Sequence, residues 1–80
     1  MKLRLFGAFK EMGSELELDL SGQDSVTVSE LRKLLAAKLG GAHAALVAQS
    51  AFGNQSKILG DGDLVRGTDE LAILPPVCGG

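Results

Sequence analysis

The sequence predicts an α+β fold in which a mixed sheet packs against one main helix. Three observations predict it: alternating segments at the start, one strongly capped amphipathic helix in the middle, and a wholly apolar segment near the end. Strands that precede and follow a single helix favour a sheet with that helix on one face. With 80 residues, of which 45% are hydrophobic, the chain can build one small core and one domain.

Two strands are predicted in the first part of the chain. Residues 1–9 begin with apolar and basic side chains in alternation, which is the period of a half-buried strand. Residues 8–12 favour a helical turn that ends at Gly13. Residues 15–20 alternate carboxylates with leucines and are the clearest strand of the sequence.

The start of the main helix is well marked. Thr27 is a good N-cap, and Glu30 three residues later completes a capping box. Val26 and Leu31 occupy the positions of a hydrophobic staple around this cap. A helix is therefore expected to begin directly after Thr27.

The body of this helix has an apolar face and a basic face. The apolar positions that recur at helical spacing are Val28, Leu31, Leu34, Leu35 and Leu39. Arg32, Lys33 and Lys38 are expected to form the solvated face. The glycine pair at 40–41 supplies the stop signal.

The second half of the chain contains short elements. Residues 42–46 favour a short helical turn, and residues 47–52 favour a strand. Residues 57–59 favour another short strand, followed by the turn sequence Gly-Asp-Gly-Asp at 60–63. Residues 71–74 are apolar on both faces, which is typical of a central strand.

Composition and charge exclude several classes of function. The formal net charge is −2 and the pI is about 5.2, which disfavours phosphate contacts and hence nucleic-acid binding. No apolar segment reaches the roughly 18–20 residues of a membrane span, and the first residues lack the apolar core of a signal peptide. The single cysteine, Cys78, cannot form an intramolecular disulfide. We therefore expect a cytoplasmic protein without a membrane or nucleic-acid partner.

The sequence offers no set of catalytic or metal-binding residues. His43 is the only histidine, and no carboxylate or second histidine stands at ligand spacing from it. Asp61 and Asp63 lie in a turn that lacks the remaining positions of a calcium loop. No nucleophile and base can be paired around one histidine. We expect a protein that is not an enzyme and that binds no metal or cofactor.

The last six residues carry most of the functional information. They are Pro75, Pro76, Val77, Cys78, Gly79 and Gly80. Two prolines favour an extended conformation, and glycines without a Cβ can enter a narrow slot. The reactive group of such an end is the Gly80 carboxylate, a poor electrophile until it is activated, for example as an acyl-adenylate. We expect residues 1–74 to form the domain and residues 75–80 to form an extended tail that presents Gly80 to other proteins.

Three segments resemble a known family. Residues 71–80, LAILPPVCGG, resemble the C-terminus of the ubiquitin-like sulfur carriers, particularly the branch that serves as small subunit of molybdopterin synthase. Residues 5–13 and 27–31 are also similar to that family. The resemblance implies a β-grasp fold whose first and last strands are parallel neighbours.

The resemblance also implies a mechanism and partners. An E1-like adenylyltransferase would use ATP to adenylate Gly80, and a persulfide donor would convert the adenylate into a thiocarboxylate. The tail would then enter the large subunit of molybdopterin synthase and give its sulfur to a pterin precursor. Gly79 would permit threading, while Pro75, Pro76 and Val77 would hold the tail clear of the domain. Cys78 is either a participating thiol or a passive residue of the tail.

Other functions remain open for the same sequence. The carrier chemistry could serve thiazole, cysteine or another thioacid-dependent product. The chain could instead be a protein modifier whose Gly80 forms isopeptide bonds with lysines, or a plain binding module with an inert tail.

Phe6 and Leu74 are the candidate partner interface. If the first and last strands pair in parallel, alternation places both side chains on the face opposite the helix. An apolar patch would then lie beside the exit of the tail, and such patches often mark protein interfaces. The alternative is a small satellite core under the turn at residues 8–12.

Overall fold

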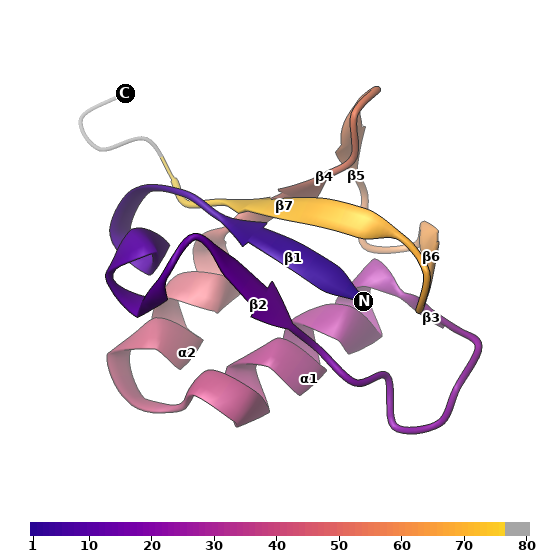
Figure 1. Ribbon diagram of the computed structural model, residues 1–80, viewed down its shortest axis with the longest axis horizontal. Helices are drawn as coiled ribbons and strands as arrows, with labels where there is room; N and C mark the ends of the chain where they lie inside the picture. The colour runs from indigo at the N-terminus through magenta and orange to yellow at the C-terminus, as the bar shows by residue number, and fades with distance from the viewer. Residues whose placement is uncertain (77–80) are drawn as a thin grey trace.

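The protein folds around a five-stranded sheet. The structure is a computed structural model that describes residues 1–76. The strands are β1 (Lys2–Leu5), β2 (Glu15–Glu17), β4 (Ala51–Gly53), β5 (Ile58–Leu59) and β7 (Glu70–Leu74). Their order is β2-β1-β7-β4-β5, so the apolar strand predicted to be central does lie in the middle of the sheet (Figure 1).

The first and last strands of this sheet are parallel neighbours, as predicted. Leu3 of β1 lies opposite Leu71 of β7, and Leu5 lies opposite Ile73. All other pairings in the sheet are antiparallel, which makes the sheet mixed. Because β1 and β7 run in the same direction, both end at one edge of the domain (Figure 1).

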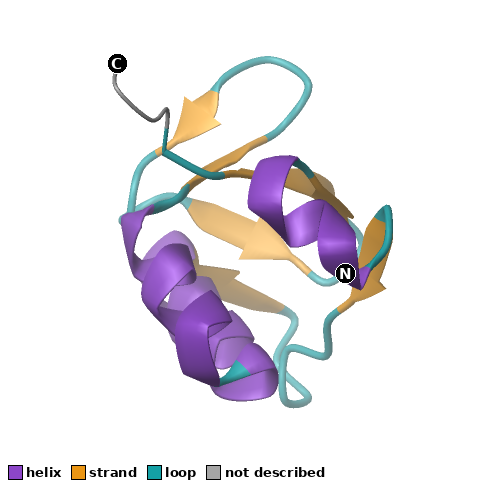
Figure 2. Cartoon of the chain, turned by 90° about the vertical axis from the view of Figure 1, so that its left-hand side faces the viewer, coloured by secondary structure: helices purple, strands orange, loops and turns teal. Residues whose placement is uncertain are grey.

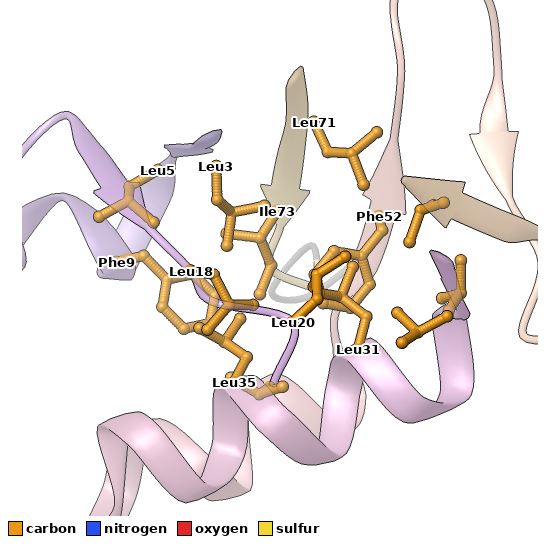
Figure 3. Packing of buried hydrophobic residues seen from close by; sticks show 14 residues of the cluster. Leu3, Leu5, Phe9, Leu18, Leu20, Leu31, Leu35, Phe52, Leu71 and Ile73 are labelled. Atoms are coloured by element: carbon orange, nitrogen blue, oxygen red, sulfur yellow. The ribbon is translucent and has the colours of Figure 1, made fainter. Parts of the chain in front are cut away.

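Helices α1 (Val28–Leu39) and α2 (Gly41–Gln49) cover one face of the sheet (Figure 2). The main helix is α1, which buries Val28, Leu31 and Leu35, whereas α2 buries only Val47. Their apolar side chains meet those of the sheet in a single core (Figure 3). The core residues are Leu3, Leu5, Phe9, Leu18, Leu20, Val26, Val28, Leu31, Leu35, Val47, Phe52, Val65, Leu71 and Ile73.

The start of α1 is capped as the sequence predicts. The backbone N–H of Glu30 donates to Thr27 Oγ1 at 3.2 Å, and Glu30 Oε1 accepts from the Thr27 N–H at 3.2 Å. The turn at residues 60–63 adds two backbone acceptors, because the Asp63 and Asp61 carbonyls accept from the first helical N–H groups. Four N–H groups at a helix start have no partner within the helix, so these bonds fix where α1 begins.

Between β1 and β2 the chain forms a short 3-10 helix, η1 (Gly7–Met12), which confirms the predicted helical turn. The side chain of Phe9 points from η1 into the core and is fully buried. The predicted strand at 15–20 is shorter in the structure, since β2 ends at Glu17. Leu18 and Leu20 are nevertheless buried, so the predicted alternation of exposed and buried side chains continues past the paired residues.

A second sheet of two strands, β3 (Ser25–Thr27) and β6 (Leu64–Arg66), is present beside the start of α1. Val26 and Val65 lie opposite each other and are both buried. This small sheet was not predicted, because three residues are too few to display a period of two. The predicted strand at 57–59 is confirmed as β5.

The predicted strand at residues 47–52 is wrong. Residues 47–49 continue α2, and the strand β4 begins only at Ala51. Ser50 ends the helix, since its N–H donates to the Val47 carbonyl and its Oγ donates to the Leu46 carbonyl. Val47 and Phe52 are both buried, but they enter the core from a helix and from a strand respectively.

The expectation that Arg32 belongs to a solvated face is also wrong. Its side chain is only 22% exposed. Nη1 donates to the carbonyls of Val47 and Ser50, and Nη2 lies 3.0 Å from Asp61 Oδ1. The guanidinium also stacks 5.2 Å from the centre of the Phe52 ring. Arg32 thus ties α1 to the end of α2, to β4 and to the turn at 60–63.

Candidate functional site

The candidate site lies at the edge where β1 and β7 both end. Leu5 and Ile73 are the last residues that β1 and β7 pair with each other, and both side chains point into the core. The backbone at Phe6 remains extended, with φ −129° and ψ 161°, so its side chain points to the opposite face. Phe6 is 40% exposed and Leu74 is half-buried. Neither side chain belongs to the buried core under the helices.

A third apolar side chain, Ile58 of β5, extends this surface. A Cβ built on Gly53 would lie 3.4 Å from Ile58 Cδ1 and 3.7 Å from Leu74 Cδ1. Ile58 and Leu74 therefore flank the bare backbone of Gly53, and Ile58 is 58% exposed. We call Phe6, Leu74 and Ile58 the apolar face. Ile58 could not be predicted from the sequence as part of this surface, because only the pairing of β4 with β5 places it beside Gly53.

The remainder of this side of the sheet carries charges in opposite pairs. Arg4 Nε lies 2.9 Å from Glu70 Oε1, and Lys2 Nζ lies 3.6 Å from Glu15 Oε2. All four side chains are about half exposed, so their attraction is largely screened by water. Phe6 and Leu74 thus occupy the end of the sheet at which the chain leaves β7, and Ile58 lies on the outer strand β5 in register with Gly53 and Ala72.

The two prolines begin the predicted tail directly after β7. Pro75 is half-buried and Pro76 is exposed. Gly7, the first residue of η1, has a φ of +58°, and a Cβ built on it would lie 2.5 Å from Pro75 Cγ. The proline ring therefore rests against glycine backbone.

Four of the predicted site residues lie outside the described residues. They are Val77, Cys78, Gly79 and Gly80. Their roles, and the predicted division of the chain into residues 1–74 and 75–80, stay predictions.

His43 contacts the short helix η1. Its Nε2 lies 2.7 Å from Glu11 Oε1, and its ring centre lies 6.4 Å from that of Phe9. This contact joins α2 to η1.

Asp63 accepts from the Gly60 N–H at 2.8 Å, as in an ordinary turn. Among residues 1–76, no group of three or more His, Cys, Asp or Glu side chains is placed to hold a metal ion. No helix in the same range has the length and apolar character needed to cross a membrane.

A mixed sheet with parallel first and last strands, covered by a main helix on one face, is the β-grasp fold of ubiquitin-like proteins. Its central strand leads straight into the segment that ends in Gly-Gly, which is the arrangement of a carrier. The sequence matches the ThiS family over residues 3–80, and the chain belongs to this family of ubiquitin-like sulfur carriers.

A solved structure supports the same fold. The crystal structure of SAMP1 from Haloferax volcanii is 25% identical in sequence, covers 100% of this chain and 98% of its own, and gives a TM-score of 0.67. The comparison with curated proteins found no match. The family and the shared fold confirm the predicted resemblance to ubiquitin-like sulfur carriers.

Proposed function

We propose that this protein carries sulfur as a thiocarboxylate on Gly80 and donates it as the small subunit of molybdopterin synthase. The observation that carries the proposal is the family match, which runs through residue 80 and includes the whole tail. The similarity of residues 71–80 and 5–13 to the molybdopterin branch favours the pterin as sulfur acceptor. The chain is then a co-substrate, and the catalytic groups belong to its partners.

Loading of the tail takes place in two stages. A carboxylate oxygen of Gly80 attacks the α-phosphorus of ATP on an E1-like adenylyltransferase, and pyrophosphate leaves. The terminal sulfur of a persulfide donor then attacks the acyl carbon, and AMP leaves with the former carboxylate oxygen. A thiol finally cleaves the sulfur–sulfur bond of the resulting acyl disulfide and is itself oxidised, which leaves the thiocarboxylate on Gly80. ATP is thus consumed by the activating enzyme and is not a cofactor of the chain.

Delivery requires that the carrier dock while its tail reaches the partner's active site. The apolar face provides a docking surface beside Pro75, with the charged pair of Arg4 and Glu70 at its border, where a polar rim is common in protein interfaces. Water then hydrolyses the acyl group as sulfur passes to the pterin precursor, so the carrier leaves with a carboxylate on Gly80 and can be loaded again.

Intact mass spectrometry tests the loading step. The protein is incubated with an E1-like adenylyltransferase, ATP, a persulfide donor and a thiol. Exchange of one oxygen for sulfur adds about 16 Da, and fragmentation must place the gain on Gly80, since oxidation of Met or Cys adds a similar mass. A variant that lacks Gly80 is expected to fold normally and to gain no mass, because the deletion lies outside the core. Wild-type protein that keeps a bare carboxylate under these conditions would overturn the proposal.

A transfer assay tests the acceptor. Loaded protein is mixed with the large subunit of molybdopterin synthase and the pterin precursor, and the dithiolene product is measured. We expect product to form with loss of the 16 Da label. Retention of the label here, with release to a thiazole or cysteine pathway enzyme, would assign the carrier to another acceptor.

Charge substitutions on the apolar face test the docking surface. We expect Phe6→Asp and Leu74→Asp to weaken binding to the large subunit by about tenfold or more, measured by calorimetry. Leu64→Asp is the control, because Leu64 is 69% exposed but belongs to the separate sheet of β3 and β6. Circular dichroism verifies that each variant is folded. Equal affinities of the Phe6 and Leu64 variants would remove the apolar face as the docking surface.

A protein modifier is the second candidate function, and the similarity to SAMP1 favours it. A lysine amine of a target protein would attack the same Gly80 adenylate and form an isopeptide bond, with AMP as leaving group. Mass spectrometry of protein from cells separates the two functions. Conjugates linked through lysine support the modifier, and a free thiocarboxylate supports the sulfur carrier.

A further inference from the structure

One close contact in the structure joins the start of η1 to the first residue of the tail. Gly7 follows β1 and Pro75 follows β7, two parallel strands that end at the same edge of the sheet (Figure 1). A Cβ built on Gly7 would lie 2.5 Å from Pro75 Cγ and 3.5 Å from Pro75 Cδ. The first distance is far below the roughly 3.5–4.0 Å of carbon–carbon contact. Only glycine lets the proline ring occupy this position.

The requirement for glycine here differs from that at the other bends. Gly7 and Gly41 have nearly the same positive φ, +58° and +57°. A Cβ on Gly41 would meet no atom within 4 Å, whereas a Cβ on Gly7 would overlap Pro75. The positive φ is thus common to both, and the overlap with the tail is particular to Gly7.

We infer that Gly7 is a positioning residue that sets the direction in which the tail leaves the domain. The inference rests on the proposed function, because direction matters only if another protein must receive the tail. Proline has a fixed φ of about −65°, so a displacement of its ring is passed directly to the backbone of Pro76. Phe6 of the apolar face immediately precedes Gly7. When a partner docks on Phe6, the orientation of Pro75 relative to that partner is therefore fixed by Gly7.

Two readouts test the inference, and the first is independent of any sulfur chemistry. In the wild-type protein, nuclear Overhauser contacts are expected between the Gly7 Hα and Pro75 Hγ protons. Gly7→Ala is expected to displace Pro75 and to change the chemical shifts of Pro75 and Pro76. Gly41→Ala, which places alanine at a matching positive φ without the overlap, is expected to leave both sets of shifts in place. Absence of the contact in the wild type, or equal shift changes in the two variants, would overturn the inference.

The second readout is the kinetics of adenylation by the E1-like enzyme. We expect Gly7→Ala to lower kcat by about tenfold or more, since small misplacements of a reacting group are costly, and to leave KM within about twofold. Phe6→Asp is expected to raise KM instead. Gly41→Ala is expected to match the wild type in both constants. An unchanged kcat for Gly7→Ala would overturn the positioning role.

Removal of the proline ring provides a double-mutant test. Pro75→Ala deletes the Cγ and Cδ atoms that overlap the added methyl group, while its Cβ stays 3.8 Å away. Gly7→Ala is therefore expected to lower kcat in the wild-type background but to have no further effect in a Pro75→Ala background. An equal loss in both backgrounds would show that Gly7 acts through backbone strain alone. If Gly7→Ala does not fold, Pro75→Ala by itself tests the contact and is expected to lower kcat without changing KM.

The two proposals fail in different ways. If the wild type is never adenylated, the proposed function fails, and the magnetic resonance contact still decides whether Gly7 holds Pro75. If the wild type is adenylated and Gly7→Ala is adenylated equally well, only the positioning role fails.

Discussion

Replacement of Arg32 by alanine tests how the strand that precedes the tail is supported. Arg32 contacts the end of α2, the turn at 60–63 and the ring of Phe52. Phe52 lies in β4 opposite Ile73 of β7, so the arginine braces the neighbour of the central strand. The Arg32→Ala variant removes all of these contacts and leaves the Ser50 carbonyl without its charged donor.

The expected loss can be worked out contact by contact. The two bonds to backbone carbonyls are charge-assisted and the side chain is only 22% exposed, so together they contribute about 2 kcal/mol after screening. The stacking on Phe52 adds about 0.5–1 kcal/mol. The pair with Asp61 adds only a few tenths of a kcal/mol, roughly, because Asp61 is 71% exposed. We expect a loss of about 3 kcal/mol, which in a domain of this size lowers Tm by about 12–24 °C.

Urea unfolding followed by circular dichroism measures this loss. Arg32→Ala is expected to lower the midpoint without changing the slope, since the surface exposed on unfolding is the same. Lys33→Ala is the control, because Lys33 is the exposed next residue of α1, and it is expected to cost less than about 0.5 kcal/mol. Arg32→Lys keeps the charge but lacks the forked guanidinium, so an intermediate loss is expected. If Arg32→Ala and Lys33→Ala have the same midpoint, the bracing role of Arg32 is refuted.

Two further substitutions test other parts of the fold by the same unfolding measurement. Thr27→Ala removes the capping box and is expected to cost about 1 kcal/mol, whereas the exposed Ser25→Ala is expected to cost much less; equal midpoints would contradict the role of the cap. Leu35→Ala leaves a cavity at a fully buried position and is expected to cost about 2–5 kcal/mol. Leu64→Ala at a 69% exposed position is the control, and a comparable loss there would contradict the assignment of the core.

The features of the fold that could be predicted from the sequence depend on short-range patterns. The capping box needs only Thr27 and Glu30, three residues apart, and it forms as predicted. The central position of β7 was predicted from four consecutive apolar residues, a pattern that is typical of central strands. By contrast, Arg32 lies off the apolar face of α1, and only the packing of α2 turns it into a partly buried residue. The error at residues 47–52 also arises from a limit of local patterns. The apolar residues there belong to the end of α2 and to β4, and their pattern alone is the same as that of one strand.

The candidate site, too, could be predicted only in part from the sequence. Alternation along β1 and β7 was enough to predict that Phe6 and Leu74 face away from the helices. Ile58 joins them only through the register of β5 against Gly53, which no local pattern encodes. The contact between Gly7 and Pro75 joins opposite ends of the chain, so the sequence shows a glycine at a bend but not the ring that rests on it.

The order of synthesis gives the placement of β7 a consequence for folding. The middle strand, β7, is the last described strand to leave the ribosome. Both β1 and β4 lack this hydrogen-bonding partner in the sheet until β7 has been synthesised. The sheet therefore cannot close on a chain that lacks β7, and such distant pairings form slowly. The contact of Pro75 with Gly7 therefore depends on β7 having joined the sheet between β1 and β4.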